Sequence, residues 1–500
     1  KLYKKARNVE LRCFEDADFY NKYTMALDKA DTKVTNIVRN IWMILFGIVG
    51  VVIVFYNMYT IDPFSVIFIL FPAIGNFGFA ALLNKNQMRM YQEDVKNVRI
   101  MQYVNRVMYL ADYSKDIRLT NIFQLMRRKY QDASKRSRDI TDKYSFKNTL
   151  WVSLKNIFQF CIIFEGVLLY GAYECLVKHK LTLAKLTVLT TIMVAATWIL
   201  IGLFDAIMNT IKDGMFIHNL RVFLDYEPKI PEDYDGIMPE DVIESIEFRD
   251  VSFSYQDEQT IKHLSFVIHG GDNVALVGHN GAGKSTIIKL LLRLYDPTQG
   301  EILLNGRNIK EYNLRAYRDL FAVAFQDYKI LAMSVKDNVL MGREEEHAKE
   351  LVEDALIKTG AITKIEQLSK GIETNLTKEF EDDGAVLSGG QYQKIVVART
   401  FAKKAPVKVF DEPSSALDPI AEYDLYTNIM KESEGKTVFF ISHRLSSVKN
   451  ANLVFMLEKG EIIERGNHIE LMRKNGSYAD MYKKQAMNYL ATEEYEGMVI

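Results

Sequence analysis

The sequence has few cysteines, no excess of either charge and no N-terminal secretory signal. Three cysteines (Cys13, Cys161 and Cys175) form neither a disulfide framework nor a metal-ligand pattern, so we interpret them as reduced apolar thiols. Lysine and arginine number 63, and aspartate and glutamate 64, which gives no electrostatic reason to expect a nucleic-acid partner. What is present is a chain of 500 residues, more than one domain usually holds.

Long hydrophobic runs fill much of the first 225 residues, whereas the remainder is typical of a soluble α/β domain. A bilayer span needs about 20 apolar residues, and four runs reach that length. Only the third is interrupted by acids, Glu165 and Glu174. A buried helix of a soluble domain would not explain two adjacent runs joined by a turn at Asp62-Pro63. We therefore predict four transmembrane helices, at residues 40–61, 63–84, 156–177 and 186–204.

Basic residues indicate how these spans are oriented. Lysine and arginine are frequent before the first span and in the segment 85–155, and they are absent from the turn at 62–63. Because basic residues favour the cytoplasmic side, we expect the N-terminus, the segment 85–155 and everything after the fourth span in the cytoplasm. The segment 85–155 has no proline and is predicted to form two long helices with a short break near 111–119.

Glu165 lies near the middle of the third predicted span. An ionisable side chain inside a membrane is by default a candidate functional residue. The alternatives are that it faces a water-filled cavity, that it pairs within the protein, or that the span has a different register. Unchanged transport and unchanged substrate-stimulated ATPase in Glu165→Gln would exclude the functional role.

A phosphate-binding loop follows a short buried strand in the C-terminal half. From about residue 241 the sequence alternates as antiparallel strands do, and NVALVG then opens into GHNGAGKST at 278–286. This stretch fits G-x-x-x-x-G-K-[ST] with a helix after it. Its glycines let backbone N–H groups approach phosphates, its lysine neutralises phosphate oxygens, and its serine can ligate Mg²⁺. The predicted ATP-binding residues of this loop are Gly278, Asn280, Gly281, Gly283, Lys284, Ser285 and Thr286.

Two adjacent acids end a second buried strand, APVKVFDEP. Asp411 is placed to hold Mg²⁺, and Glu412, on the opposite side of the backbone, can polarise an attacking water. Taken alone, such a pair could be a solvated strand end. Downstream of a phosphate loop it predicts ATP hydrolysis.

A second phosphate-binding arrangement occurs at LSGGQ (387–391), where a serine and two glycines precede a predicted helix. Free N–H groups and the positive end of the helix dipole favour phosphate there. Together with the phosphate loop, the DE pair, SSALD at 414–418 and ISHR at 441–444, this sequence resembles the nucleotide-binding domain of ABC transporters across roughly 241–489.

The first half is similar to the fused permease of ABC exporters, of a bacterial, Firmicute-like kind. FEDADFYNKYTMALDKAD at 14–31 and KDIRL at 115–119 look like the two intracellular loops that dock on the ATPase. The family's exporters have six spans per subunit, so the resemblance implies that two more precede Lys1.

The resemblance implies roles for further residues. Tyr255 matches the aromatic residue that stacks on adenine, and Gln326 matches the glutamine that senses Mg²⁺ and the permease. His443 matches the histidine that contacts the γ-phosphate and orients Glu412, and Asp418 matches the aspartate that crosses the dimer interface. The implied catalytic set is Lys284, Gln326, Glu412 and His443, and the implied metal set is Ser285, Gln326 and Asp411.

The resemblance also explains why one domain carries two phosphate-binding elements. In this family two ATPase domains face head to tail, and ATP is held between the phosphate loop of one and the LSGGQ of the other. The chain must therefore pair with another chain, either a second copy or a paralogous half-transporter. The residues that would cap the γ-phosphate of the partner are Ser388, Gly389, Gly390 and Gln391.

Lys408 departs from the family, which usually has an apolar residue at this strand position. Burying an unpaired ammonium costs several kcal/mol. We therefore predict that the side chain has a partner or reaches solvent.

The sequence thus predicts a multidomain membrane protein with an all-α transmembrane helix bundle followed by an α/β P-loop ATPase domain of the ABC type. The predicted parts are a permease domain (1–228), a linker (229–240), the ATPase domain (241–489) and a tail (490–500). It would be a multi-pass plasma-membrane protein with a cytoplasmic ATPase that uses ATP and Mg²⁺ to export a peptide, lipid or amphipathic drug.

Three other functions are less compatible with the sequence. The spans argue against a soluble, non-transport ABC ATPase. The intact Glu412 and His443 argue against an ATP-gated channel or regulatory subunit. Importers usually keep permease and ATPase on separate chains.

Overall fold

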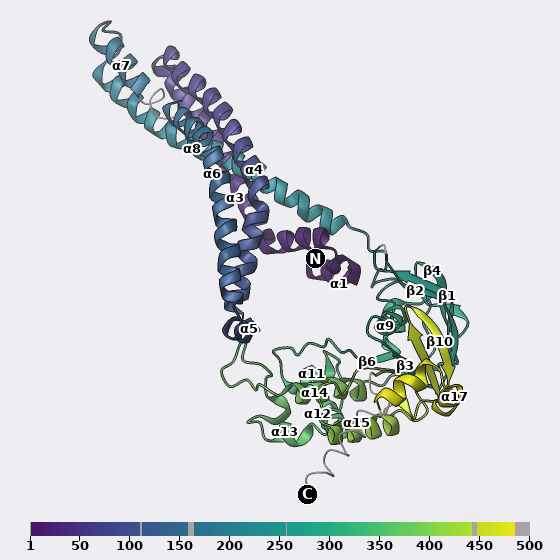
Figure 1. The fold of residues 1–500 in the computed structure, drawn as a ribbon. Helices are drawn as coiled ribbons and strands as arrows, with labels where there is room; N and C mark the ends of the chain where they lie inside the picture. Colours follow the sequence, from purple (N-terminus) through teal and green to yellow (C-terminus); the bar gives the residue numbers. More distant parts are fainter. Residues whose placement is uncertain (1, 111–112, 159–164, 257, 443–447, 486–500) are drawn as a thin grey trace. The chain divides into compact units, whose positions relative to one another are not determined.

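The computed structural model describes the chain except for residues 1, 111–112, 159–164, 257, 443–447 and 486–500 (Figure 1). Contacts divide it into two compact units. The helical unit consists of Asn21–Asp225, and the α/β unit consists of Lys1–Tyr20 together with Tyr226–Ile500. The predicted tail, 490–500, and His443 lie outside the described residues.

Long helices form the helical unit. The predicted pair of helices in 85–155 is confirmed, because α4 and α6 are separated only by a short segment that contains α5. Polar bonds join α4 to α6, among them Lys143 to Glu93 at 2.8 Å and Ser137 to Asp94 at 2.7 Å. The elements of the helical unit are α3 (Ala17–Ile61), η1 (Pro63–Val66), α4 (Ile67–Tyr109), α5 (Ser114–Leu119), α6 (Ile122–Asn156), α7 (Gly166–Leu176) and α8 (Leu183–Asp225).

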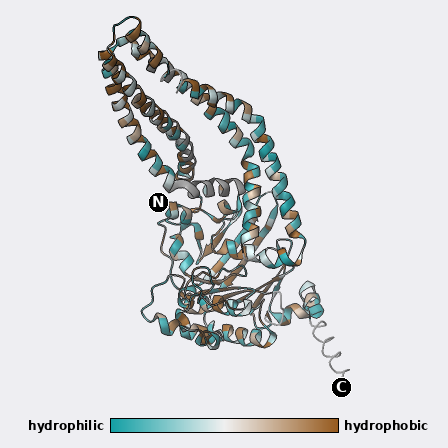
Figure 2. Ribbon diagram, turned by 90° about the vertical axis from the view of Figure 1, so that its left-hand side faces the viewer, coloured by the Kyte–Doolittle hydropathy of each residue, from teal (hydrophilic) through white to brown (hydrophobic). Residues whose placement is uncertain are grey.

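Two helical stretches of this unit, Thr32–Ile61 and Leu183–Ile211, are long and apolar enough to cross a membrane. They contain the first and fourth predicted spans. The second predicted span begins in η1 and continues in α4, and the third includes residues outside the described set. Figure 2 shows hydrophobic residues gathered toward one end of the helical unit and hydrophilic residues toward the other.

The two acids of the third predicted span differ in their surroundings. The Glu165 side chain is exposed, just before α7 begins. The Glu174 carboxylate is buried and accepts a hydrogen bond from Lys178 Nζ at 2.8 Å. Glu174 is therefore paired internally, whereas a role for Glu165 stays a prediction.

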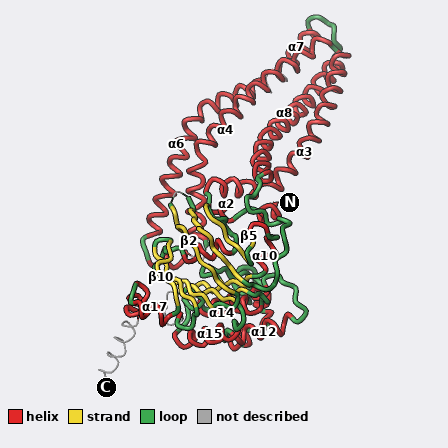
Figure 3. The backbone as a smooth tube through the Cα atoms, turned by 90° about the vertical axis from the view of Figure 1, so that its right-hand side faces the viewer, coloured by secondary structure: helices red, strands yellow, loops and turns green. Residues whose placement is uncertain are grey.

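Two sheets organise the α/β unit (Figure 3). One has the order β2-β1-β4-β5 and is antiparallel, and the other has the order β10-β9-β3-β8-β7-β6. In the second sheet all neighbouring strands are parallel except the β9–β10 pair. The first sheet comprises β1 (Ser245–Ser254), β2 (Gln259–His269), β4 (Gln299–Leu304) and β5 (Arg307–Asn308). The second comprises β3 (Asn273–Gly278), β6 (Phe321–Ala324), β7 (Val407–Asp411), β8 (Thr437–Ile441), β9 (Leu453–Glu458) and β10 (Glu461–Gly466).

Two strands in the second sheet, β7 and β8, are buried along their whole length. Such burial is typical of parallel strands covered on both faces. Helices α11, α12 and α14 share a separate apolar core that includes Val339, Leu356 and Ile395. The helices of this unit are α1 (Leu2–Asn8), α2 (Leu11–Glu15), α9 (Lys284–Leu291), η4 (Ile309–Glu311), α10 (Leu314–Asp319), α11 (Val335–Leu340), α12 (Ala348–Lys358), α13 (Ile362–Glu366), η5 (Gly371–Glu373), α14 (Gly389–Ala402), α15 (Pro419–Glu432) and α17 (His468–Lys474).

Hydrogen bonds attach the first residues of the chain to the segment that follows α8. The Tyr226 hydroxyl donates to Glu10 Oε1 at 2.5 Å and accepts from Cys13 Sγ at 3.3 Å. Lys5 Nζ donates to the Tyr226 carbonyl, and Asn8 Nδ2 donates to Asp233. These contacts account for the grouping of residues 1–20 with the α/β unit.

Lys408 has the partner that its burial requires. Its Nζ donates to the Glu432 carbonyl at 3.3 Å and lies 4.9 Å from the centre of the Phe401 ring. Burial, with a smaller effect from the nearby charge of Lys436, lowers the pKa of Lys408 to about 8. The prediction of a partner is confirmed.

Candidate nucleotide-binding site

The phosphate loop connects β3 to α9, and its backbone can be formed only with glycine at two positions. Gly278 has φ +152°, and a Cβ there would lie 2.3 Å from the Leu457 carbonyl oxygen. Gly283 has φ +102° and precedes the first residue of α9. Both φ values belong to a region that side-chain-bearing residues rarely adopt. The loop therefore brings bare backbone to the N-terminus of α9, an arrangement that favours a phosphate.

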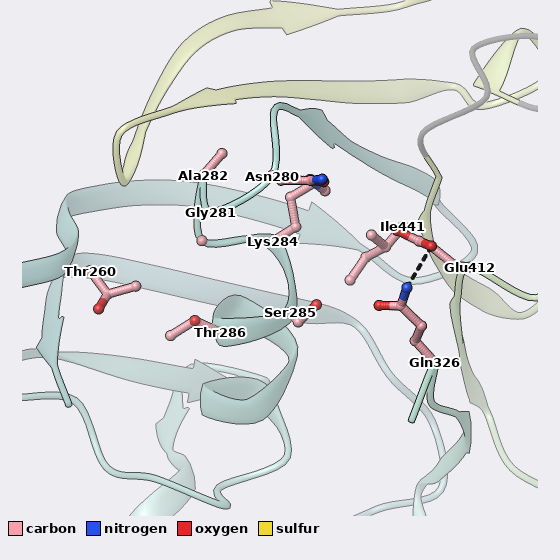
Figure 4. A pocket seen from close by; sticks show the side chains of 11 residues that line it. Thr260, Asn280, Gly281, Ala282, Lys284, Ser285, Thr286, Gln326, Glu412 and Ile441 are labelled. Carbon is pink, nitrogen blue, oxygen red and sulfur yellow. Dashed lines mark hydrogen bonds between the residues drawn. The ribbon is translucent and has the colours of Figure 1, made fainter. Parts of the chain in front are cut away.

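A cavity of about 500 Å³ lies against this loop (Figure 4). It combines the loop with side chains from the ends of β6, β7 and β8, which are neighbours in the second sheet. The cavity thus lies at the carboxyl ends of parallel strands, where open α/β sheets bind ligands. Its lining consists of Thr260, Asn280, Gly281, Ala282, Gly283, Lys284, Ser285, Thr286, Gln326, Glu412 and Ile441.

Lys284 is buried at the start of α9. Its Nζ donates to the carbonyls of Gly278 at 2.8 Å and His279 at 3.0 Å. Burial lowers the pKa of Lys284, and the negative charges of Glu412 and Asp411 oppose that shift. The ammonium group is thus held on the loop, where it can neutralise phosphate oxygens.

Glu412 is fixed in an uncommon backbone conformation at the end of β7. Its φ is +49°, its N–H donates to the Ile441 carbonyl at 2.9 Å, and its Oε2 accepts from Gln326 Nε2 at 2.8 Å. Figure 4 shows this last bond between Gln326 and Glu412. Left-handed backbone in a residue other than glycine is uncommon and is often found at functional sites.

Asp411 is the better placed of the two acids to hold a metal ion. Burial raises its pKa to about 6, while a hydrogen bond with Ser285 acts in the opposite direction. Its Oδ1 is buried and has no hydrogen-bond partner among the described residues. An unsatisfied buried carboxylate oxygen beside a serine hydroxyl fits Mg²⁺, which prefers oxygen ligands.

A Mg²⁺ site here would combine oxygens of the protein with those of water and nucleotide. Within the described residues, no group of three or more His, Cys, Asp or Glu side chains could hold a metal. Mg²⁺ characteristically uses one or two carboxylates together with waters and phosphate oxygens. Ser285, Gln326 and Asp411 therefore fit a nucleotide-dependent metal site.

Tyr255 lies beside the phosphate loop. Its hydroxyl is 3.3 Å from Thr286 Oγ1, and its ring meets the Tyr295 ring edge to face at 5.2 Å. Lys289 Nζ lies 5.5 Å from the centre of the Tyr255 ring. The ring therefore lies next to the phosphate loop, but Tyr255 is not among the residues that line the cavity, and its stacking on adenine stays a prediction.

The LSGGQ residues (387–391), here called the signature, lie outside the cavity lining, and α14 is the signature helix. Ser388 caps α14 through a reciprocal pair of bonds with Gln391, which measure 3.0 and 3.4 Å. Asp418 similarly caps α15 by accepting from the N–H groups of Ile420 and Ala421. Both helix starts are formed, but neither Ser388 nor Asp418 contributes to the cavity that holds Lys284.

The sequence motifs did not point to Gln393, which contacts the segment after β7 directly. Its side chain is buried and donates to the Glu412 carbonyl at 2.8 Å. The only signal in the sequence is its position two residues after LSGGQ. Thr260 and Ile441 also line the cavity without having been predicted.

A phosphate loop with a buried lysine after β3, and an acid pair at the end of β7, two strands away in the same sheet, define a P-loop nucleotide hydrolase. A family model described as "ABC transporter" matches residues 261–415. The subtilin transport ATP-binding protein SpaT of Bacillus subtilis is 30% identical over 99% of this chain and 80% of its own length. The chain belongs to the ABC transporter family.

Other relatives and a solved structure agree with this membership. An ATP-dependent lipid A-core flippase of Haemophilus influenzae is 34% identical over 64% of this chain and 54% of its own length. A probable multidrug resistance ABC transporter protein, YheH of Bacillus subtilis, is 37% identical over 53% of this chain and 39% of its own length. The structure of a bacterial Atm1-family ABC exporter with ATP bound covers 97% of this chain and 84% of that one, with a TM-score of 0.81 and 23% identity.

These findings confirm the predicted fold class and the predicted ATP-driven export. The protein is a membrane-located ABC exporter subunit with ATPase activity coupled to transport. The soluble ATPase and the channel are correspondingly disfavoured.

Proposed function

We propose that the chain is one half of a dimeric exporter in which ATP is bound between two α/β units. The observation that carries the proposal is the cavity in which Lys284, Glu412 and Gln326 converge while the signature helix lies elsewhere. The second phosphate-binding element of each site would come from the partner chain. ATP would then hold the dimer closed, and hydrolysis would release it.

Each residue of the cavity has a proposed part in hydrolysis. Lys284 and the loop N–H groups hold the phosphates, and Tyr255 stacks on the adenine. Glu412 accepts a proton from, or orients, the attacking water, and Gln326 keeps its carboxylate in place. His443, outside the described residues, is proposed to contact the γ-phosphate.

Ser285, Asp411 and Gln326 would hold Mg²⁺ directly or through water. When bound, the ion would neutralise charge on the β- and γ-phosphate oxygens. The buried, unpartnered Oδ1 of Asp411 supports this assignment.

We propose a plasma-membrane location with several spans and a cytoplasmic ATPase, with the permease domain at 1–228, a linker at 229–240 and the ATPase domain at 241–489. The apolar stretches Thr32–Ile61 and Leu183–Ile211 and the basic segment 85–155 support this topology. The partner is a second copy or a paralogous half-transporter. Because the catalytic motifs are intact, a homodimer is the simpler arrangement.

The proposed substrate is a peptide, a lipid or an amphipathic drug. Relatives carry the names subtilin transport, lipid A-core flippase and multidrug resistance, so candidates from each of these groups are the first to test. Stimulation of the ATPase by one group and not by the others would identify the class.

The central test is ATP hydrolysis by the full chain in lipid nanodiscs, compared with Glu412→Gln. We expect wild-type turnover, and a loss of at least 100-fold in the variant with ATP retained in a closed dimer, because a base within reach of the water contributes roughly 10²–10⁴-fold. Glu350→Gln, an exposed carboxylate on α12, is the matched control and should keep full activity.

The outcomes separate the parts of the proposal. A folded wild-type chain that binds ATP without hydrolysing it would refute the homodimer and indicate a paralogous partner. Full activity in Glu412→Gln would refute the catalytic role of this residue.

A further inference from the structure

The side-chain amide of Gln393 contacts three groups in the segment that follows β7. Its Nε2 donates to the Glu412 carbonyl at 2.8 Å and to Ser415 Oγ at 3.0 Å. Its Oε1 accepts from the Ala416 N–H at 2.8 Å. Only 3% of Gln393 is exposed, so water cannot readily replace these bonds if they are lost.

These bonds hold Glu412 at a point where its backbone is strained. The left-handed φ of +49° turns the chain directly after β7. Among the bonds described, its N–H donates to the Ile441 carbonyl at the end of β8, and its carboxylate accepts from Gln326 after β6. Its carbonyl accepts from Gln393 on α14 and from the Ser415 N–H at 3.4 Å. Strained conformations persist only where their surroundings determine them, and the shorter of the two bonds to the carbonyl comes from Gln393.

The helix that carries Gln393 also carries the signature residues. Ser388 caps α14, and Gln393 lies about one turn further along the same helix. Its contacts at Ser415 and Ala416 lie just before Asp418, which caps α15. One buried side chain therefore connects the start of α14 to the catalytic glutamate of the same chain.

We propose that Gln393 is a positioning residue that fixes the Glu412 backbone and couples the signature helix to it. A shift of α14 when its N-terminus engages a nucleotide held by the partner chain would thereby be transmitted to the glutamate of this chain's own site. This inference rests on the proposed function, since it assumes that Glu412 acts on ATP.

The test is steady-state ATP hydrolysis by the full chain in nanodiscs for Gln393→Met, which has similar length but no hydrogen-bonding amide. We expect kcat to fall at least tenfold while the KM for ATP changes less than twofold. The phosphate loop is untouched, whereas a displacement of about 1 Å in a catalytic group can cost up to 100-fold. Gln393→Leu, which is uncharged and likewise has no hydrogen-bonding amide, is the second variant if Gln393→Met does not fold, with the same expected fall in kcat.

Thr400→Val is the matched control. Thr400 is buried on the same helix, and its hydroxyl bonds only to the Val397 carbonyl of α14 among the bonds described. If Thr400→Val lowers the thermal midpoint as much as Gln393→Met does but keeps the wild-type kcat, lowered stability alone does not reduce turnover. Unchanged kcat in a folded Gln393→Met protein would overturn the proposal.

A double-mutant cycle distinguishes positioning from a general structural role. If Gln393 acts through Glu412, Gln393→Met should change residual single-turnover hydrolysis of labelled ATP less than twofold in a Glu412→Gln background. An equal loss in both backgrounds would overturn the proposal. A wild-type chain that binds ATP but lacks activity would instead refute the homodimer, and full activity in Glu412→Gln would refute the catalytic glutamate on which this inference depends.

Discussion

The ammonium group of Lys408 lies inside the sheet whose strand β7 ends at Asp411, next to Glu412. A lysine whose pKa falls from 10.5 to about 8 on folding is less stable as a cation in the folded state than in the unfolded state. Converted at about 1.4 kcal/mol per pKa unit, the difference is on the order of 3 kcal/mol. Its bond to the Glu432 carbonyl only partly offsets this cost.

We expect Lys408→Met to raise the stability of the full chain at pH 7 by about 1–3 kcal/mol, because an apolar side chain of similar length carries no desolvation cost. Below pH 8 the lysine is charged in both states and the cost is fully present. Between pH 8 and 10.5 the folded state releases its proton first, so wild-type stability rises with pH and the advantage of the variant shrinks. Thermal midpoints at pH 7 and pH 9.5 measure this, and a constant difference would refute it.

At the residue scale, short sequence motifs predict the proposed site residues, but they do not predict Gln393, which contacts the backbone of one of them. Lys284, Asp411 and Glu412 stand in short contiguous motifs, so their proposed roles could be predicted from their neighbours in sequence. Gln393 acts on residues 412–416 across the fold, and no local pattern encodes that contact. The partner of Lys408 could be predicted because a charged side chain in an apolar strand needs a partner or a path to solvent.

Helix α14 and the loop before α15 approach closely at Gly390. A Cβ on Gly390 would lie 2.8 Å from the Ala416 carbonyl oxygen, whereas one on Gly389 would find its nearest neighbour, the Ala416 Cβ, at 3.8 Å. The first distance requires the backbone to move, and the second is an ordinary contact. Two adjacent glycines of one motif therefore have different structural requirements.

We expect Gly390→Ala to lower the thermal midpoint of the full chain by about 2–4 °C, the shift that roughly 1 kcal/mol of overpacking produces in a domain of this size. Gly389→Ala should leave the midpoint unchanged or raise it, because alanine favours helix by up to about 1 kcal/mol over glycine. Differential scanning calorimetry without nucleotide would measure both. Equal shifts in the two variants would contradict the close approach at Gly390.

Membrane-spanning helices were predictable where a long apolar run contains no charged residue, and less so where acids interrupt the run. The uncharged spans 40–61 and 186–204 fall inside helical stretches that are apolar enough to cross a membrane. The third predicted span contains two acids, and Glu174 proves to be paired with Lys178, which hydropathy alone does not reveal. The break between α4 and α6 could be predicted because a short polar segment separates two long runs without proline.

At the scale of the whole molecule, the two phosphate-binding elements of one chain are in different places. Lys284 lines the nucleotide cavity, and the signature residues Ser388 and Gln391 do not. This separation supports the proposal that one complete site takes its LSGGQ element from a second chain. The sequence contains both motifs, but only the structure shows that they lie at different places in the fold.

Complementation between two inactive chains tests this arrangement. Lys284→Ala removes the phosphate-loop ammonium, and Ser388→Arg places a bulky side chain at the exposed start of α14. If the signature acts on the partner's nucleotide, a mixed dimer has one site with both defects and one intact site. We expect each variant alone to lose ATPase activity and dimers purified through two different tags to regain a measurable part of it. If the signature acted within its own chain, every site of the mixed dimer would carry one defect, and the mixture would be as inactive as its parents.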